Sequence, residues 1–184
     1  MSKVLNILII ISFSFCFNNS LLSTKYDVEI LRDSWGVPHI YGVTDKDVAF
    51  GFAFAHSEDD FKTIQDVVLQ TRGKLSSIYG KETLPIDYLT NLLRVRENVE
   101  KNYDKLISSE VKDIIEAYVD GLNYYSSLNP TEAFDEIGQI TNYDIVSGFV
   151  FRTQFLYGLD FYFNFLFESK NQKKQPELPK EIWR

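Results

Sequence analysis

The chain has 184 residues and a formal charge of -7, and 45% of its residues are hydrophobic and 24% are charged. This composition indicates a packed globular protein rather than a disordered one. The acidic charge argues against nucleic acid as a partner, because a phosphate backbone is bound by clustered Lys and Arg side chains.

Residues 1–20 are predicted to be a signal peptide. Lys3 provides the positive start, and the apolar run over residues 4–17 is short for a membrane span. We therefore expect a secreted or periplasmic chain that has no membrane contact once the signal is removed. Cys16 is the only cysteine and would leave with the signal, so no disulfide is expected. Lipidation of this cysteine is the less favoured alternative, because Phe15 rather than a small residue precedes it.

A β-hairpin is predicted at the start of the mature chain. Val28 and Ile30 alternate with the polar Glu29, which is the period of a half-buried strand. Turn-forming residues follow at 33–36, and an extended run then resumes. Because Pro38 cannot donate to a sheet, the second strand should be an edge strand or begin at this residue.

A long helical segment is predicted next. Thr44 and Asp47 resemble a capping box at its start, and apolar residues recur at helical spacing as far as Val68. The pattern stops at residues 72–73, and a further short piece ends at Gly80, so we expect one bent helix or a helical hairpin. Small side chains leave a face on which another element can pack closely: Ala49, Gly51 and Ala53.

Two more helices are predicted in the second half of the chain. Ser109 is expected to cap the first of them, which should end before Pro130. The second is expected to run from Tyr143 or Asp144 to Phe163 and is apolar on nearly every face. A helix with apolar side chains all round is expected to be buried.

Few side chains suggest a metal site or a catalytic group. His39 and His56 are the only histidines, and neither belongs to a zinc-binding pattern, so His39 is interpreted as a packed or surface imidazole. The acidic run 58–60 is interpreted as a solvated face in which one Asp pairs with Arg32 or Arg72, and a catalytic carboxylate pair is the less favoured alternative. No Gly-x-Ser-x-Gly nucleophile motif occurs.

Several ordered blocks stand out in the sequence. They are Arg-Asp-Ser-Trp-Gly-Val-Pro-His-Ile at 32–40, Phe-Gly-Phe-Ala-Phe-Ala-His-Ser-Glu-Asp-Asp-Phe at 50–61, Gln-Asp through Arg-Gly to Tyr-Gly at 65–80, Asp87, and Ala-Tyr-Val-Asp-Gly-Leu-Asn at 117–123. Together they resemble the penicillin acylase family of N-terminal-nucleophile hydrolases. The second and third blocks look most like its aculeacin and acyl-homoserine-lactone acylase branch.

The resemblance implies an α+β fold with four αββα layers, built by a precursor that cuts itself into an α chain and a β chain. Residues 24–167 would be the α-chain region, an incomplete and mainly helical domain with an N-terminal hairpin, and the polar residues 168–184 a tail or linker. The partner β chain would carry the N-terminal Ser nucleophile, the amine base and the oxyanion donors. No catalytic residue is therefore expected in this chain.

The implied activity is hydrolysis of the amide of an acylated small molecule: an acyl-homoserine lactone, a lipopeptide or a β-lactam side chain. The resemblance places Thr153 and Tyr157 where the penicillin G enzymes present a Met and a Phe to the acyl group, and Phe149 is their neighbour by helical spacing. Phe163 stands where some members carry a Glu that helps bind calcium; a phenyl ring offers no oxygen, so no metal or cofactor is expected. The alternative is a truncated or split-gene product that acts at most as a ligand-binding module.

Overall fold

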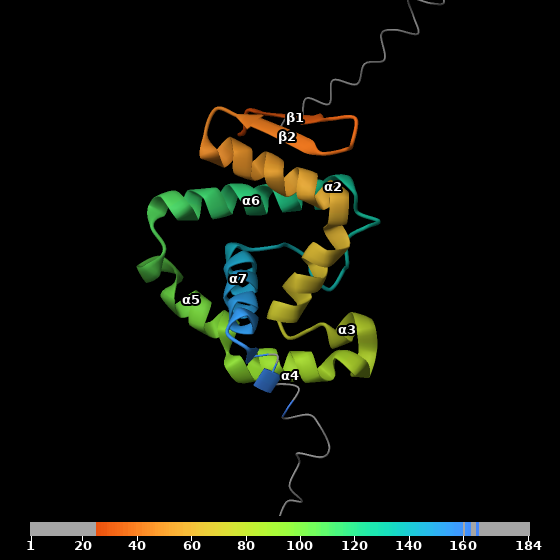
Figure 1. The fold of residues 1–184 in the computed structure, drawn as a ribbon, viewed down its shortest axis with the longest axis vertical. Coiled ribbons are helices and arrows are strands. Elements are labelled where there is room, and N and C mark those ends of the chain that lie inside the picture. Colours follow the sequence, from red (N-terminus) through yellow and green to blue (C-terminus); the bar gives the residue numbers. More distant parts are fainter. Residues whose placement is uncertain (1–24, 160, 163–164, 166–184) are drawn as a thin grey trace, which may run out of the picture.

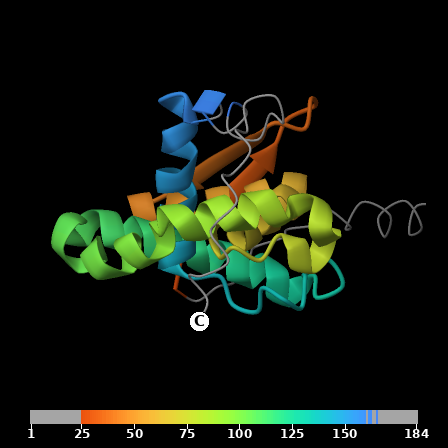
Figure 2. The same cartoon turned by 90° about the horizontal axis from the view of Figure 1, so that it is seen from below.

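The computed structural model describes residues 25–159, 161, 162 and 165, so the predicted signal peptide and the polar tail lie outside it. A two-stranded hairpin lies over helix α2 (Asp45–Thr71), and α2 packs along α6 (Ser109–Leu128) (Figure 1). Below this pair in Figure 1, α7 (Asn142–Leu156) runs down toward α4 (Leu84–Leu93), with α5 (Val95–Leu106) beside it. Figure 2, seen from below, shows α7 crossing the direction of α4 and α5. The chain is thus mainly helical with an N-terminal antiparallel hairpin.

The hairpin agrees with its prediction. Strand β1 (Val28–Arg32) pairs antiparallel with β2 (Pro38–Gly42), and Ile30 lies opposite Ile40. The Asp33 carboxylate accepts the backbone N–H groups of the tight turn, and these bonds hold its pKa below the ordinary value. The second strand begins at Pro38, as its missing N–H required.

Helix α2 begins at the predicted capping box, in which Thr44 caps the helix and the Asp47 carboxylate accepts the backbone N–H of Thr44 at 2.9 Å. It is bent, because Asp60 leaves the helical conformation (φ -158°, ψ 62°). The Asp60 carboxylate accepts the N–H of Thr63 and so restarts the helix after the bend. The chain leaves α2 at Gly73, whose φ is +64°, and the bent-helix alternative is confirmed.

The predicted small face of α2 is where two other elements approach closely. A Cβ on Gly51 would lie 2.5 Å from a methyl of Val28 in the hairpin. On the other side, a Cβ on Gly121 of α6 would lie 2.5 Å from the backbone oxygen of Phe50 and 2.8 Å from Cβ of Ala53. Small residues at these crossings bring the hairpin, α2 and α6 into contact.

Residues 76–106 form short helices that the sequence analysis did not assign beyond Gly80. They are α3 (Ser76–Tyr79), the 3-10 turn η1 (Gly80–Thr83), α4 and α5. The buried carboxylate of Asp87 accepts the backbone N–H groups of Leu75 and Ser76, both at 2.8 Å, and so ties α4 to α3. Helices α4 and α5 meet at Arg94, which has a left-handed backbone (φ 51°).

Two predicted helix boundaries need correction. Helix α6 is capped by Ser108 and not by Ser109, because the Ser108 hydroxyl accepts the N–H of Val111. Helix α7 ends at Leu156, where the sequence predicted Phe163, because the chain turns at Gly158 (φ +85°). Phe163 itself lies outside the described residues.

The expectation that the last helix is buried all round is also wrong. Only a strip of α7 is buried, at Asp144, Ser147, Gly148 and Phe151. Phe151 joins the side chains of α5 in one apolar cluster, whereas the larger cluster lies between α2 and α6. Of the helices in the described part of the chain, none has the length and apolar character needed to cross a membrane.

Candidate functional site

The predicted substrate-binding residues lie on the exposed side of α7. Phe149 and Tyr157 are 76% and 81% exposed, and Thr153 is partly buried between them. Phe149 and Thr153 are four residues apart on one face of the helix, and Tyr157 follows as its C-cap residue. The Thr153 hydroxyl donates to the Phe149 carbonyl at 2.8 Å. The Phe149 and Tyr157 side chains are therefore open to solvent in this chain, and Thr153 is only partly so.

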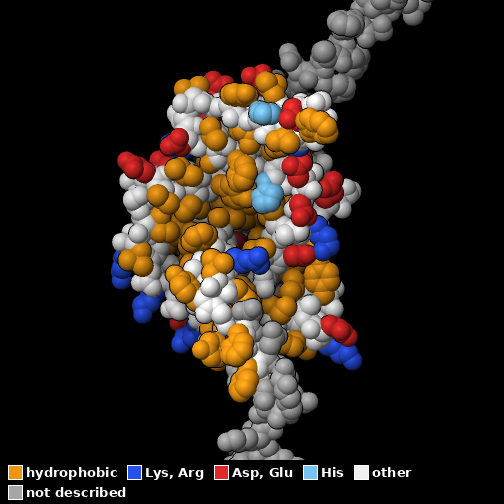
Figure 3. Space-filling view, in the orientation of Figure 1, with side chains coloured by type: hydrophobic (Ala, Val, Ile, Leu, Met, Phe, Trp, Pro, Cys, Tyr) orange, Lys and Arg blue, Asp and Glu red, His pale blue; other side chains and the backbone are white. Residues whose placement is uncertain are grey.

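An apolar surface surrounds this face of α7. Figure 3 shows hydrophobic side chains gathered over α2, α6 and α7, with the two histidines on the same side of the molecule. Phe52 of α2 is half exposed, and its ring stacks on that of His56 with the centroids 5.9 Å apart. Exposed apolar side chains that lie together in this way make this face a candidate binding surface.

His56 is bonded within this surface. Its Nδ1 lies 3.0 Å from the Tyr118 hydroxyl, whose pKa is raised by burial. Among the described residues, no Ser, Thr or Cys side chain is bonded to it. His39 is a surface imidazole 3.5 Å from Asp33, as the sequence analysis favoured.

The acidic run 58–60 has structural partners. Arg32 of the hairpin pairs with Glu58 and with Asp59, each at 2.8 Å, which confirms one of the two partners expected from the sequence. Asp60 serves the bend of α2, and its bonds with Thr63 lower its pKa. An open cleft of about 420 Å³ beside this run is not lined by any of the predicted substrate-binding residues.

A metal site is not formed by the part of the chain that the structure describes, since no three His, Cys, Asp or Glu side chains gather there in a way that could hold an ion. The position compared with the calcium-binding Glu, Phe163, lies outside the described residues.

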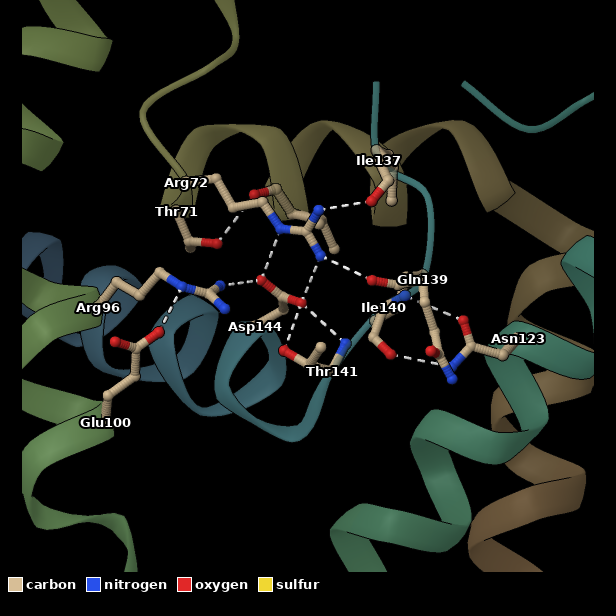
Figure 4. Close-up of polar contacts among 11 residues, drawn as sticks. Thr71, Arg72, Arg96, Glu100, Asn123, Ile137, Gln139, Ile140, Thr141 and Asp144 are labelled. Atoms are coloured by element: carbon tan, nitrogen blue, oxygen red, sulfur yellow. Dashed lines mark hydrogen bonds and ion pairs between the residues drawn. The ribbon is translucent and has the colours of Figure 1, made fainter. Parts of the chain in front are cut away.

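A buried ion cluster anchors the first turn of α7 (Figure 4). The Asp144 side chain is 0% exposed and accepts Nε and Nη2 of Arg72, from the end of α2, at 2.8 and 2.7 Å. It also accepts a bond from Arg96 of α5 and two from Thr141, at 2.7 and 2.8 Å. Burial alone would raise the pKa of Asp144, but the bonds from Arg72 and Thr141 outweigh burial and lower it.

The same cluster holds the loop that leads into α7. Arg72 donates to the carbonyl oxygens of Ile137 and Gln139 at 2.6 and 2.9 Å. Asn123 of α6 bonds both backbone groups of Ile140 (Figure 4). This cluster was not predicted from the sequence, although Thr141 and Asp144 repeat the spacing of the capping box at the start of α2.

The family model described as penicillin amidase matches residues 27–172. The chain belongs to the penicillin amidase family. It is 28% identical over 98 residues to the penicillin acylase 2 proenzyme of Pseudomonas sp. (strain SE83), with 53% of this chain and 12% of the relative covered. It is 24% identical over 110 residues to the acyl-homoserine lactone acylase PvdQ of Pseudomonas fluorescens (strain Pf0-1), with 56% and 14% covered. The match thus spans only about an eighth of each relative's length.

The fold is similar to a solved structure, the thermostable penicillin G acylase from Alcaligenes faecalis. The TM-score is 0.57 at 18% sequence identity, and the match covers 84% of this chain and 97% of that chain. At this identity the comparison shows the fold alone. It confirms a mainly helical chain with an N-terminal hairpin.

Proposed function

We propose that this chain is the N-terminal α-chain part of a secreted or periplasmic amidohydrolase that cleaves the amide of an acylated small molecule. Two coverages carry this proposal. The fold match covers 97% of one penicillin G acylase chain, whereas the sequence match covers only 12% of a penicillin acylase proenzyme. This pattern is expected when a long precursor is cut into two chains and the shorter chain is compared with each form. A partner β chain supplies the nucleophile, so this chain is inactive alone.

Two features of the fold support the proposal that a second chain binds to this one. The exposed apolar surface over α2, α6 and α7 is the kind of area that a second chain buries. In addition, among the described residues β1 and β2 pair only with each other, so further strands of an αββα fold would come from outside this part of the chain. The β chain is therefore proposed to complete both the sheet and the apolar surface.

The acyl group is proposed to bind against the exposed side of α7. Phe149 and Tyr157 offer apolar area there, and Thr153 lies between them with its hydroxyl bonded to the backbone. The relatives named above include a penicillin acylase and an acyl-homoserine lactone acylase, so an acylated lactone and a β-lactam are the first substrates to test.

The test is co-expression of this chain with the protein sequence that continues its reading frame, followed by measurement of kcat/KM over a series of acyl lengths. Tyr157→Ala and Thr153→Trp should reorder the preferred lengths by about 10-fold or more, because each group that fills or vacates a pocket is worth about 1–3 kcal/mol. Tyr88→Ala is the matched control, since Tyr88 is an exposed aromatic on α4.

Each other result has a definite meaning. Hydrolysis by residues 24–184 alone would contradict the need for a β chain. Length preferences unchanged in both variants would reject the placement of the acyl group. A stop codon after Arg184, no β-chain gene and a soluble monomeric product would favour the truncated ligand-binding module instead.

A further inference from the structure

The polar contacts that join α7 to α2, α5 and the preceding loop lie at its first turn, on Asp144. Its buried side chains run from Asp144 to Phe151, whereas Leu156 and Tyr157 near its end are exposed. The later part of the helix is held by apolar contacts, among them the rings of Phe151 and Phe155 with centroids 5.2 Å apart. The contacts that can fix the direction of the helix are therefore the polar ones at its first turn.

The hold on the first turn is directional. The Arg72 guanidinium grips both oxygens of Asp144 in a fork, which fixes the plane of the carboxylate as well as its distance. Arg96 reaches the same carboxylate from α5, and its Nε also bonds Glu100 at 2.8 Å. Apolar contacts such as those of Phe151 give area without fixing orientation.

A small rotation at this point has a large effect at the other end. Asp144 and Tyr157 are separated by about 20 Å along the helix axis, from a rise of about 1.5 Å per residue. A tilt of about 3° about the first turn therefore moves Tyr157 by about 1 Å. Displacements of about 1 Å are enough to change how a substrate is held for reaction.

We propose that the Arg72–Asp144–Arg96 cluster is a positioning device that sets the direction of α7 and thereby the acyl length that the assembled hydrolase prefers. This inference rests on the proposed function. Arg72 binds the Asp144 carboxylate to the end of α2, and Arg96 binds it to α5. The three residues touch no substrate and act through the helix.

The matched variants are Arg96→Gln and Arg94→Gln, measured in the assembled protein with its β chain. Arg94 immediately precedes the same helix and pairs with Glu97 in its first turn, at 2.5 Å, and not with Asp144. Arg96→Gln should change the ratio of kcat/KM between a short and a long acyl chain by about five-fold or more, and Arg94→Gln by less than about two-fold. Arg96→Lys should restore most of the wild-type ratio, because it keeps the charge beside Asp144.

The inference would be overturned if Arg96→Gln and Arg94→Gln gave the same ratio of kcat/KM between short and long acyl chains. A lower melting temperature of Arg96→Gln would not rescue it, because loss of stability alone does not change a specificity ratio. If the wild-type assembly hydrolyses no acylated amide, the proposed function fails. Backbone amide exchange then decides the positioning separately. Faster exchange confined to α7 in Arg96→Gln supports a hold on this helix, and exchange equal to that of wild type rejects it.

Discussion

Replacing Gly121 with Ala tests the closest crossing in the fold. The new Cβ would lie 2.5 Å from the backbone oxygen of Phe50 and 2.8 Å from Cβ of Ala53. Backbone atoms cannot move aside without displacing α2, and overpacking of this kind costs about 1–3 kcal/mol. Because the clash is with backbone, the cost should lie at the upper end of this range, about 3 kcal/mol; Ala gains about 1 kcal/mol over Gly in a helix interior, so the net loss should be about 2 kcal/mol. For a chain of this size that lowers the melting temperature by about 5 °C.

Thermal melting followed by far-UV circular dichroism measures this effect. Gly148→Ala is the matched control, because the nearest atom to its Cβ is a Val67 methyl at 3.0 Å, which can shift by a side-chain rotation. The control should melt within about 3 °C of wild type, since a small clash is offset by helix propensity. Equal melting temperatures for the two variants, or a more stable Gly121→Ala, would refute the close crossing of α2 and α6.

Three other substitutions test the polar anchors. Asp144→Asn should lower the free energy of unfolding by about 3 kcal/mol, since it leaves two arginines without their buried partner. The pKa of Asp144 is lowered in the folded state, so wild type should lose this stability as the pH falls below about 3.9. The Asn variant should not show that loss. Equal acid unfolding of the two proteins would contradict a charged Asp144 in the folded state. Asp87→Ala should cost about 2 kcal/mol in urea unfolding by leaving the N–H groups of Leu75 and Ser76 unpaired, and a neutral effect would argue against that bond. Thr44→Ala should cost about 1 kcal/mol in the same assay, with no change meaning that the cap is not used.

Signals between neighbouring residues were enough to predict the hairpin and α2. The turn chemistry at 33–36, the proline that starts β2 and the Thr44–Asp47 capping box each act over a few residues, so they can be read without knowing the tertiary structure. The close approaches at Gly51 and Gly121 were also foreshadowed, because small residues at helical spacing leave room for a neighbour.

The buried ion cluster could not be predicted in the same way. Arg72, Arg96 and Asp144 come from three helices that are far apart in sequence, and charged residues are ordinarily expected at the surface. The joint at Arg94 was equally hidden, since a left-handed backbone favours Gly or Asn and an arginine gives no such signal.

The last helix shows how an apolar pattern can mislead. Its aromatic and aliphatic residues suggested burial on every side, but the described residues cover only one strip of it. A sequence records that a side chain is apolar and not which chain will cover it. The assignments of Phe149, Thr153 and Tyr157 came from the family resemblance, and their part in binding remains a prediction.

The pairing of α2 with α6 also governs when the chain can fold during synthesis. The apolar side of α2, including Phe54 and Leu69, is completed by Leu122 of α6 and by Ile137 in the loop that follows. At a synthesis rate of about 5–20 residues per second, α2 leaves the ribosome roughly a few seconds before this cover arrives. The intervening helices cost little in loop closure, which rises by only about 0.6 kcal/mol for each doubling of length. Slower translation of residues 72–116 is therefore expected to lower the yield of folded protein by prolonging this exposure, with no change in the native structure.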